Sequence, residues 1–176
     1  KGKLATVRIG HDDIAFLQYT GGTTGIAKGA MLTHGNMLAN LEQVNLWISV
    51  SFKEASEIAV APLPMYHIFC LTSTLGFLKW GSMILLITNP RDLPGFVKEL
   101  GQWKFSVLTG VNTLFNGLMN TPGFDKLDFS ALKVVVGGGA SVHKAVAERW
   151  QQITGTYLTE AYGLTETSPG VCCTPL

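Results

Sequence analysis

The chain has 176 residues, of which 47% are hydrophobic and only 14% are charged, against about 25% charged residues in an average soluble protein. This length suits one domain with a sizeable core, and a net charge of +1 provides neither a basic face for nucleic acid nor an acidic tail. Composition therefore favours small-molecule chemistry. Three cysteines at no metal-ligand spacing, Cys70, Cys172 and Cys173, favour a reducing cytoplasm.

The first predicted strand, Ile14 to Thr20, is a short apolar run that leads into a glycine-rich loop. Glycines let backbone N–H groups approach an anion, and threonine hydroxyls and the Lys28 ammonium group add donors. Lys28 is followed by Gly29 rather than Ser or Thr, so the loop is not of the Walker type, and its glycine spacing does not fit the dinucleotide pattern. Composition leaves an ordinary turn and a triphosphate site as equal alternatives.

The next segments predict a second strand at 29–33 and a helix with apolar residues at helical spacing, capped by Thr33 or Asn36. The run 58–78 contains no charged residue, but two prolines interrupt it, so we interpret it as a buried strand, a loop and a buried helix rather than a membrane span. His67 lies at the junction of that loop and helix, where ligands bind in open α/β sheets. We therefore expect His67 to be functional.

The elements expected in this region and beyond alternate between strand and helix. They are strands at 57–61, 82–87, 105–108, 133–136 and 156–159, and helices at 68–79, 93–103, 111–119 and from a Ser141 cap to Gly155. This alternation predicts an α/β fold with a mostly parallel, doubly wound sheet and helices on both faces. The loops after Thr20, Val136 and Thr159 are expected at one edge of that sheet.

Three segments, 19–29, 64–69 and 162–167, resemble the motifs of the adenylate-forming superfamily in order and rough spacing. The segments 31–34, 88–92 and 109–115 look specifically like bacterial long-chain fatty-acid–CoA ligases. The resemblance implies that residues 1–176 are a single α/β piece of the AMP-binding, N-terminal domain of a longer enzyme. The C-terminal lid domain would then lie beyond Leu176, and this chain alone would bind ATP weakly and turn over negligibly.

The resemblance implies that the full enzyme activates a long-chain fatty acid with ATP to acyl-AMP and then forms a thioester with coenzyme A. Catalytic roles fall on Thr165, Glu166, His67 and Lys28, with Glu166 as the ligand of Mg²⁺. The first group of expected ATP-binding residues is Tyr19, Thr20, Gly21, Gly22, Thr23, Thr24, Gly25, Ile26, Ala27, Lys28, Gly29 and Ala30. The second group is Gly137, Gly138, Gly139, Ala140, Glu160, Ala161, Tyr162, Gly163, Leu164 and Thr165. The fatty acid is expected at His67, Val111, Thr113 and Gly139.

Two alternatives stay open from the sequence: another adenylate-forming ligase, such as an aryl- or short-chain acyl-CoA ligase, and a nucleotide-binding module without catalysis. Fatty acid, ATP and coenzyme A are the expected partners, with no nucleic acid. The expected location is the cytoplasm. Peripheral contact with the inner face of the membrane and a homodimer are further options for the full protein.

Overall fold

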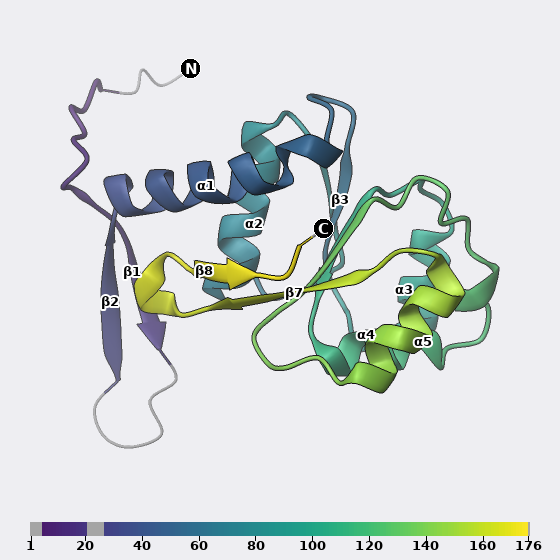
Figure 1. Ribbon diagram of the computed structural model, residues 1–176. Helices are drawn as coiled ribbons and strands as arrows, with labels where there is room; N and C mark the ends of the chain where they lie inside the picture. Colours follow the sequence, from purple (N-terminus) through teal and green to yellow (C-terminus); the bar gives the residue numbers. More distant parts are fainter. Residues whose placement is uncertain (1–4, 21–26, 176) are drawn as a thin grey trace.

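A computed structural model describes residues 5–20 and 27–175 of the chain (Figure 1). The main sheet has six strands in the order β4-β3-β5-β6-β7-β8, of which the first five run parallel and β8 pairs antiparallel with β7. The strands are β3 (Ile58–Ala61), β4 (Met83–Leu86), β5 (Val107–Gly110), β6 (Val134–Gly137), β7 (Leu158–Gly163) and β8 (Gly170–Cys173). The predicted mostly parallel sheet is confirmed.

Helices cover both faces of this sheet, as the doubly wound prediction requires (Figure 1). One face carries α1 (His34–Ile48) and α2 (Ile68–Lys79), and the other carries α3 (Leu93–Leu100), α4 (Asn112–Met119) and α5 (Lys144–Thr154). Alternate strand residues divide between the two cores: Val107 packs with Phe77, while Leu108 packs with Phe115 and Trp150. The largest core cluster therefore lies between the sheet and the helices α3, α4 and α5.

Strands β1 (Ile14–Thr20) and β2 (Lys28–Thr33) form a separate antiparallel hairpin instead of joining the main sheet (Figure 1). The expectation that the strand ending at Thr20 belongs to that sheet was therefore wrong. Local pairing satisfies the backbone groups of both strands, and the hairpin packs on α1 and α2 through Leu32, Met37 and Ile68. The glycine-rich segment thus connects two strands of a hairpin.

Helix ends agree with the prediction where capping residues or an apolar run next to the helix determine them. Helix α2 matches its prediction at both ends, and α1 is capped by Thr33, whose Oγ1 accepts a hydrogen bond of 3.1 Å from the Asn36 N–H. The α1 cap contains the reciprocal bond as well, because Asn36 Oδ1 accepts from the Thr33 N–H at 3.3 Å. Within the described residues, no helix is long and apolar enough to cross a membrane, which agrees with our interpretation of the uncharged run.

Other boundaries differ from the prediction. Helix α3 ends at Leu100, three residues before the expected end, and the last predicted strand is displaced to Leu158–Gly163. Ser141 does not cap α5, which begins at Lys144 after His143. The reason is tertiary, because the Val142 and His143 N–H groups donate to side chains of other elements and keep this segment out of the helix. Three 3₁₀ turns complete the fold: η1 (Ser49–Ser51), η2 (Phe124–Lys126) and η3 (Thr165–Thr167).

Candidate active site

The carboxyl ends of the parallel strands meet at one edge of the sheet and carry several of the predicted site residues. His67 follows β3, Val111 follows β5, and the Gly137–Ala140 loop follows β6. The register pairs Gly137 with Gly110 of β5 and with Glu160 of β7. This edge is where open α/β sheets bind ligands, so the topology brings these segments together without any further assumption.

Gly138 is the point where three of these segments touch. A Cβ at this position would lie 3.1 Å from Phe69 Cε1 and 3.3 Å from the Ala161 carbonyl oxygen, so there is little room for a side chain. The Gly138 N–H donates to the Gly110 carbonyl at 3.1 Å, which fixes the loop against β5. The next residue, Gly139, has φ +75°, a left-handed conformation that glycine adopts without strain. Gly138 is therefore packed inside the fold, while the two residues that follow it, Gly139 and Ala140, are exposed.

His67 is the N-cap residue of α2, and its side chain is exposed. Its Nδ1 accepts a hydrogen bond of 3.3 Å from the Phe69 N–H. An accepting Nδ1 carries no proton, so the ring proton of the neutral histidine lies on Nε2. Nε2 is left free to donate to a substrate oxygen. The sequence placed His67 at this junction, but it did not reveal that the same ring caps the helix.

The backbone before His67 is held by two bonds that the sequence did not suggest. The buried Cys70 thiol donates to the Leu63 carbonyl oxygen at 3.0 Å, and burial raises the pKa of this thiol despite that bond and one with Thr74. Gln18 Nε2 on β1 donates to the Tyr66 carbonyl oxygen. Gln18 therefore links the hairpin to the loop that carries His67.

The hairpin presents its predicted residues on an exposed surface. Lys28 begins β2, and its carbonyl oxygen accepts a hydrogen bond of 3.4 Å from Thr20 Oγ1. Tyr19 pairs with Gly29 across the hairpin and is 66% exposed. Ala27 is exposed and Ala30 is partly buried. The predicted residues Gly21, Gly22, Thr23, Thr24, Gly25 and Ile26 lie outside the described part of the chain.

The turn between β7 and β8 carries Thr165 and Glu166 on η3, and it packs beside β2. The Leu164 N–H donates to the Pro169 carbonyl at 3.1 Å, which closes this turn. Glu166 is exposed and Thr165 is partly buried. The structure thus brings the strand that starts at Lys28 next to the turn that contains Glu166, although far more than a hundred residues separate them in the chain.

Strand β7 itself carries Glu160, Ala161, Tyr162 and Gly163 to this turn. The sequence placed these residues in a loop after Thr159, but they belong to β7: Glu160 pairs with β6, and the next three residues pair with β8, with a register shift between Tyr162 and Gly163. Tyr162 is 57% exposed, and a Glu160 carboxylate oxygen accepts a 3.4 Å bond from the Val142 N–H. Leu164 is 47% exposed at the end of the strand. Glu160 therefore holds the start of the α5 segment while Tyr162 keeps an accessible ring face.

The carboxylate, histidine and cysteine side chains near the candidate site decide whether it could bind a metal ion. Within residues 5–20 and 27–175, no group of three or more His, Cys, Asp and Glu side chains could hold one. Glu166 is an exposed carboxylate beside the hairpin that carries Lys28, so it can supply one oxygen ligand. Mg²⁺ commonly takes one or two carboxylates and completes its shell with phosphate oxygens and water. Glu166 therefore fits a magnesium ion that arrives with a nucleotide.

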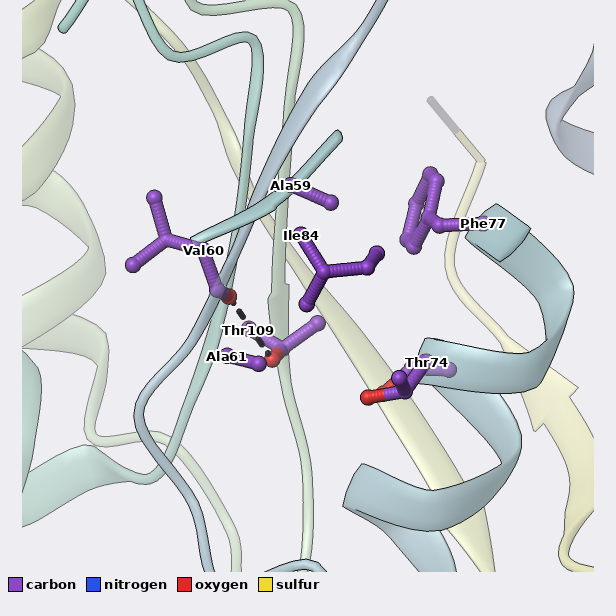
Figure 2. Close-up of a pocket in the computed structure, with 8 residues that line it drawn as sticks. Ala59, Val60, Ala61, Thr74, Phe77, Ile84 and Thr109 are labelled. Carbon is purple, nitrogen blue, oxygen red and sulfur yellow. Dashed lines mark hydrogen bonds between the residues drawn. The ribbon is translucent and has the colours of Figure 1, made fainter. Parts of the chain in front are cut away.

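The predicted acyl-binding residues His67, Val111 and Gly139 lie at the same edge of the sheet, and Thr113 lies on the helix that follows β5. Val111 is partly buried before α4, and Thr113 is exposed on its first turn. A cavity of about 10 Å³ lies between α2 and the sheet, next to Thr74, Phe77 and Thr109 (Figure 2). This space is about that of one water molecule, and neither Val111 nor Thr113 lines it.

The structure is thus an α/β domain with a glycine loop at the carboxyl edge of its sheet, and it carries the exposed side chains of Lys28 and Glu166 on neighbouring segments. The model of the AMP-binding enzyme family matches residues 2–176. The chain therefore belongs to the AMP-binding enzyme family.

Individual relatives agree with this assignment. The chain is 58% identical over 165 residues to the long-chain-fatty-acid–CoA ligase of Escherichia coli O6:H1, a match that covers 93% of this chain and 29% of that protein. The N-terminal domain of FACL13 from Mycobacterium tuberculosis has the same fold, with a TM-score of 0.86, 24% identity, and coverage of 96% of this chain and 41% of that one. Apo MatB from Rhodopseudomonas palustris aligns with a TM-score of 0.80 and 28% identity, over 99% of this chain and 33% of that one. The chain thus spans less than a third of the length of its Escherichia coli relative.

Proposed function

We propose that this chain is the nucleotide-binding part of a long-chain fatty-acid–CoA ligase. The observation that carries the proposal is the placement of β2, which begins at Lys28, beside the η3 turn that contains Glu166. An ammonium group and a carboxylate on neighbouring exposed segments suit a triphosphate with its cation. The name of the 58% identical Escherichia coli relative supports the substrate class. In this proposal residues 1–176 are one unit of the AMP-binding domain, and a lid domain belongs to the rest of the full-length protein.

The proposed reaction has two steps. A carboxylate oxygen of the fatty acid attacks the α-phosphorus of ATP, pyrophosphate leaves, and acyl-AMP forms. The thiol of coenzyme A then attacks the acyl carbonyl carbon, and AMP leaves. Lys28 and Thr20 would neutralise and hold the β- and γ-phosphates, while Thr165 would donate to the α-phosphate. Mg²⁺ held by Glu166 would supply charge neutralisation on the phosphate oxygens.

Other side chains would orient the two organic substrates. The exposed side chain of Tyr162 would stack on adenine, and the exposed backbone at Gly139 and Ala140 would lie along the base and the acyl carbonyl. His67 would donate from Nε2 to a carboxylate oxygen of the fatty acid, because its Nδ1 is occupied by the Phe69 N–H. Such positioning raises the rate by holding the carboxylate in line with the phosphorus.

Calorimetric titration with Mg·ATP tests the nucleotide site in this chain. Lys28→Ala and Glu166→Gln should each weaken binding about 10- to 100-fold, because a charge-assisted hydrogen bond contributes about 1.5–3 kcal/mol. The matched controls are Lys104→Ala and Glu148→Gln, which remove the same kinds of charge from exposed ion pairs elsewhere on the molecule. Equal binding by all four variants would rule out the proposed phosphate and metal contacts.

Pyrophosphate exchange by the full-length protein tests the substrate class. Exchange that depends on long-chain fatty acids supports the proposal, and exchange that depends on aryl or short-chain acids would replace it with another adenylate-forming ligase. Nucleotide binding without any acid-dependent exchange would identify a non-catalytic module. The same assay with and without Mg²⁺ tests the role of the cation. The effect of Mg²⁺ on exchange should be lost in Glu166→Gln, which lacks the carboxylate.

The proposed location is the cytoplasm, supported by the free thiols of Cys70, Cys172 and Cys173. Fractionation of cells that express the full-length protein tests this location. If the protein is recovered in the membrane pellet and salt releases it, the protein contacts the membrane peripherally. Sedimentation of the purified full-length protein distinguishes a monomer from a homodimer.

A further inference from the structure

The buried side-chain amide of Asn40 on α1 is hydrogen-bonded to the backbone of β8, the strand that follows the turn with Glu166. Asn40 is only 5% exposed. Its Nδ2 donates to the Gly170 carbonyl oxygen at 2.8 Å, and its Oδ1 accepts from the Gly170 N–H at 3.0 Å. An amide is the side chain that offers a donor and an acceptor side by side, so it can satisfy both backbone groups of one residue. Asn40 and Gly170 therefore form a closed pair between segments 130 residues apart in the chain.

The contact leaves little room for adjustment. A Cβ on Gly170 would lie 3.3 Å from Asn40 Oδ1 and 3.4 Å from Val44 Cγ2, closer than most side-chain contacts. At the other end of the turn, a Cβ on Gly163 would lie 2.3 Å from the Pro169 carbonyl oxygen. The turn from Gly163 to Gly170 is thus folded tightly on itself, and Gly170 is its attachment to α1.

The same helix continues directly from the hairpin. Helix α1 begins at His34 immediately after β2, and Thr33 at the end of β2 is its N-cap. Met37 on α1 packs with Leu32 of β2 in a small apolar cluster. Asn40 lies one turn further along α1, so its bonds to Gly170 connect the helix that continues from β2 to the strand that follows the turn with Glu166.

We propose that Asn40 is a positioning residue that sets the spacing between Lys28 and Glu166 without touching the substrate. The inference rests on the proposed ATP site, since that spacing is what the triphosphate and its cation would span. A displacement of about 1 Å in such a site costs roughly 100-fold in rate. Loss of the amide therefore affects the ATP half of the reaction more than the binding of the fatty acid.

The test measures steady-state pyrophosphate exchange and Mg·ATP binding in the full-length protein with Asn40→Ala. The matched control is Asn45→Ala, which removes a second buried amide of the same helix. Asn45 is 7% exposed and its Oδ1 accepts from Trp80 Nε1 at 3.0 Å, away from the candidate site. Asn40→Ala loses the two bonds to Gly170 and Asn45→Ala loses the one bond from Trp80, so thermal denaturation of both variants separates the loss of stability from the loss of activity.

For Asn40→Ala we expect kcat/KM for ATP to fall about 10- to 100-fold while KM for the fatty acid stays within about 2-fold. Asn45→Ala should leave both within about 2-fold once its stability loss is taken into account. Gly170→Ala places a Cβ 3.3 Å from Asn40 Oδ1 and disturbs the same contact from the strand side. It should give a smaller fall in kcat/KM for ATP, and it replaces Asn40→Ala in the test if that variant does not fold. Equal effects of Asn40→Ala and Asn45→Ala, or an equal loss in all parameters, would overturn the inference.

The two proposals fail in different ways. Absence of acid-dependent exchange in the unaltered protein overturns the proposed reaction, and the affinity of the Asn40→Ala variant for Mg·ATP then decides the inference about spacing. Normal exchange in the unaltered protein and in Asn40→Ala overturns the spacing inference alone.

Discussion

The buried ion pair between Glu57 and Lys133 gives the sharpest stability prediction. The Glu57 side chain is 1% exposed, and its Oε1 accepts from Lys133 Nζ at 2.6 Å and from the Lys53 N–H at 2.9 Å. Burial raises the pKa of Glu57, but the hydrogen bonds from Lys133 and its other donors outweigh that effect, so the pKa lies below its ordinary value of 4.5. Glu57 is therefore a charged group that depends on its partner.

Replacing Lys133 by Met keeps most of the side-chain volume and removes the ammonium group. Removing one partner of a buried pair costs about 3–5 kcal/mol, because the other charge stays buried without compensation. Lys133 is 41% exposed on its side chain, so water replaces part of the lost interaction. We therefore expect Lys133→Met to lower the free energy of unfolding at pH 7 by about 2–3 kcal/mol, below the usual range for fully buried pairs.

The pH dependence distinguishes this mechanism from a simple packing defect. In the unaltered chain the lowered pKa of Glu57 contributes stability that is complete above pH 4.5 and is lost as the pH falls through the folded-state pKa. In Lys133→Met the lowering effect of the ammonium group is absent while burial remains, so we expect the pKa of Glu57 in the folded chain to rise. The penalty is then complete at high pH and shrinks as Glu57 takes up a proton in acid.

Urea denaturation at pH 7 and pH 5 measures both effects. The difference between the unaltered chain and Lys133→Met should be smaller at pH 5 than at pH 7. The control is Lys104→Met, since the Lys104 and Asp128 side chains are 77% and 56% exposed and lie 3.7 Å apart, a pair that contributes less than about 1 kcal/mol. A Lys133→Met loss below about 1 kcal/mol, or a difference that does not change with pH, would refute the reasoning.

Three further predictions concern His67, the thiols and the glycines. His67→Asn keeps an N-cap side chain and should preserve stability while abolishing fatty-acid activation in the full-length protein, whereas His67→Ala should also lose about 1 kcal/mol of stability by urea denaturation; activity of either variant equal to that of the unaltered protein would exclude the Nε2 role. At pH 8 a thiol reagent should label the exposed Cys172 quickly and the buried Cys70, whose pKa burial raises, only on unfolding, as mass spectrometry of the labelled peptides can check. Gly137→Ala should destabilise by about 1–3 kcal/mol in thermal melts, because its Cβ would lie within 2.8 Å of two core side chains, while Gly76→Ala, with 3.5 Å to its nearest neighbour, should stabilise helix α2.

The parts of the fold that depend on nearby residues could be predicted from the sequence. Helix α2 was placed at both ends because an apolar run lies between the loop after Pro64 and the basic residue Lys79, and α1 because Thr33 and Asn36 form a capping pair. The alternation of strands and helices gave the parallel sheet, since βαβ units have few other ways to pack. Local signals were sufficient in each case.

The missed features depend on partners far away in the chain. Ser141 has the chemistry of a cap, but the bonds from the next two N–H groups to Glu160 and Asn112 decide where α5 begins. Strand β8 is a four-residue segment whose pairing with β7 is set by a turn and by Asn40. Of the candidate site, the sequence placed His67 and the Gly137–Ala140 loop at the sheet edge, while the links through Gln18 and Asn40 needed the three-dimensional structure.

The separation of the β1–β2 hairpin from the main sheet has a consequence for local stability. Within the described residues the hairpin shares no strand pairing with the main sheet, so it can open by breaking its contacts with α1, α2 and η3 and the bond from Gln18, without disturbing the central strands. Its amide protons should therefore exchange with solvent deuterium through a low-energy opening, and those of β5 and β6 only through global unfolding. Local opening of the hairpin and global unfolding of the sheet are therefore separate events, and a substitution on β1 or β2 can change the first without changing the second.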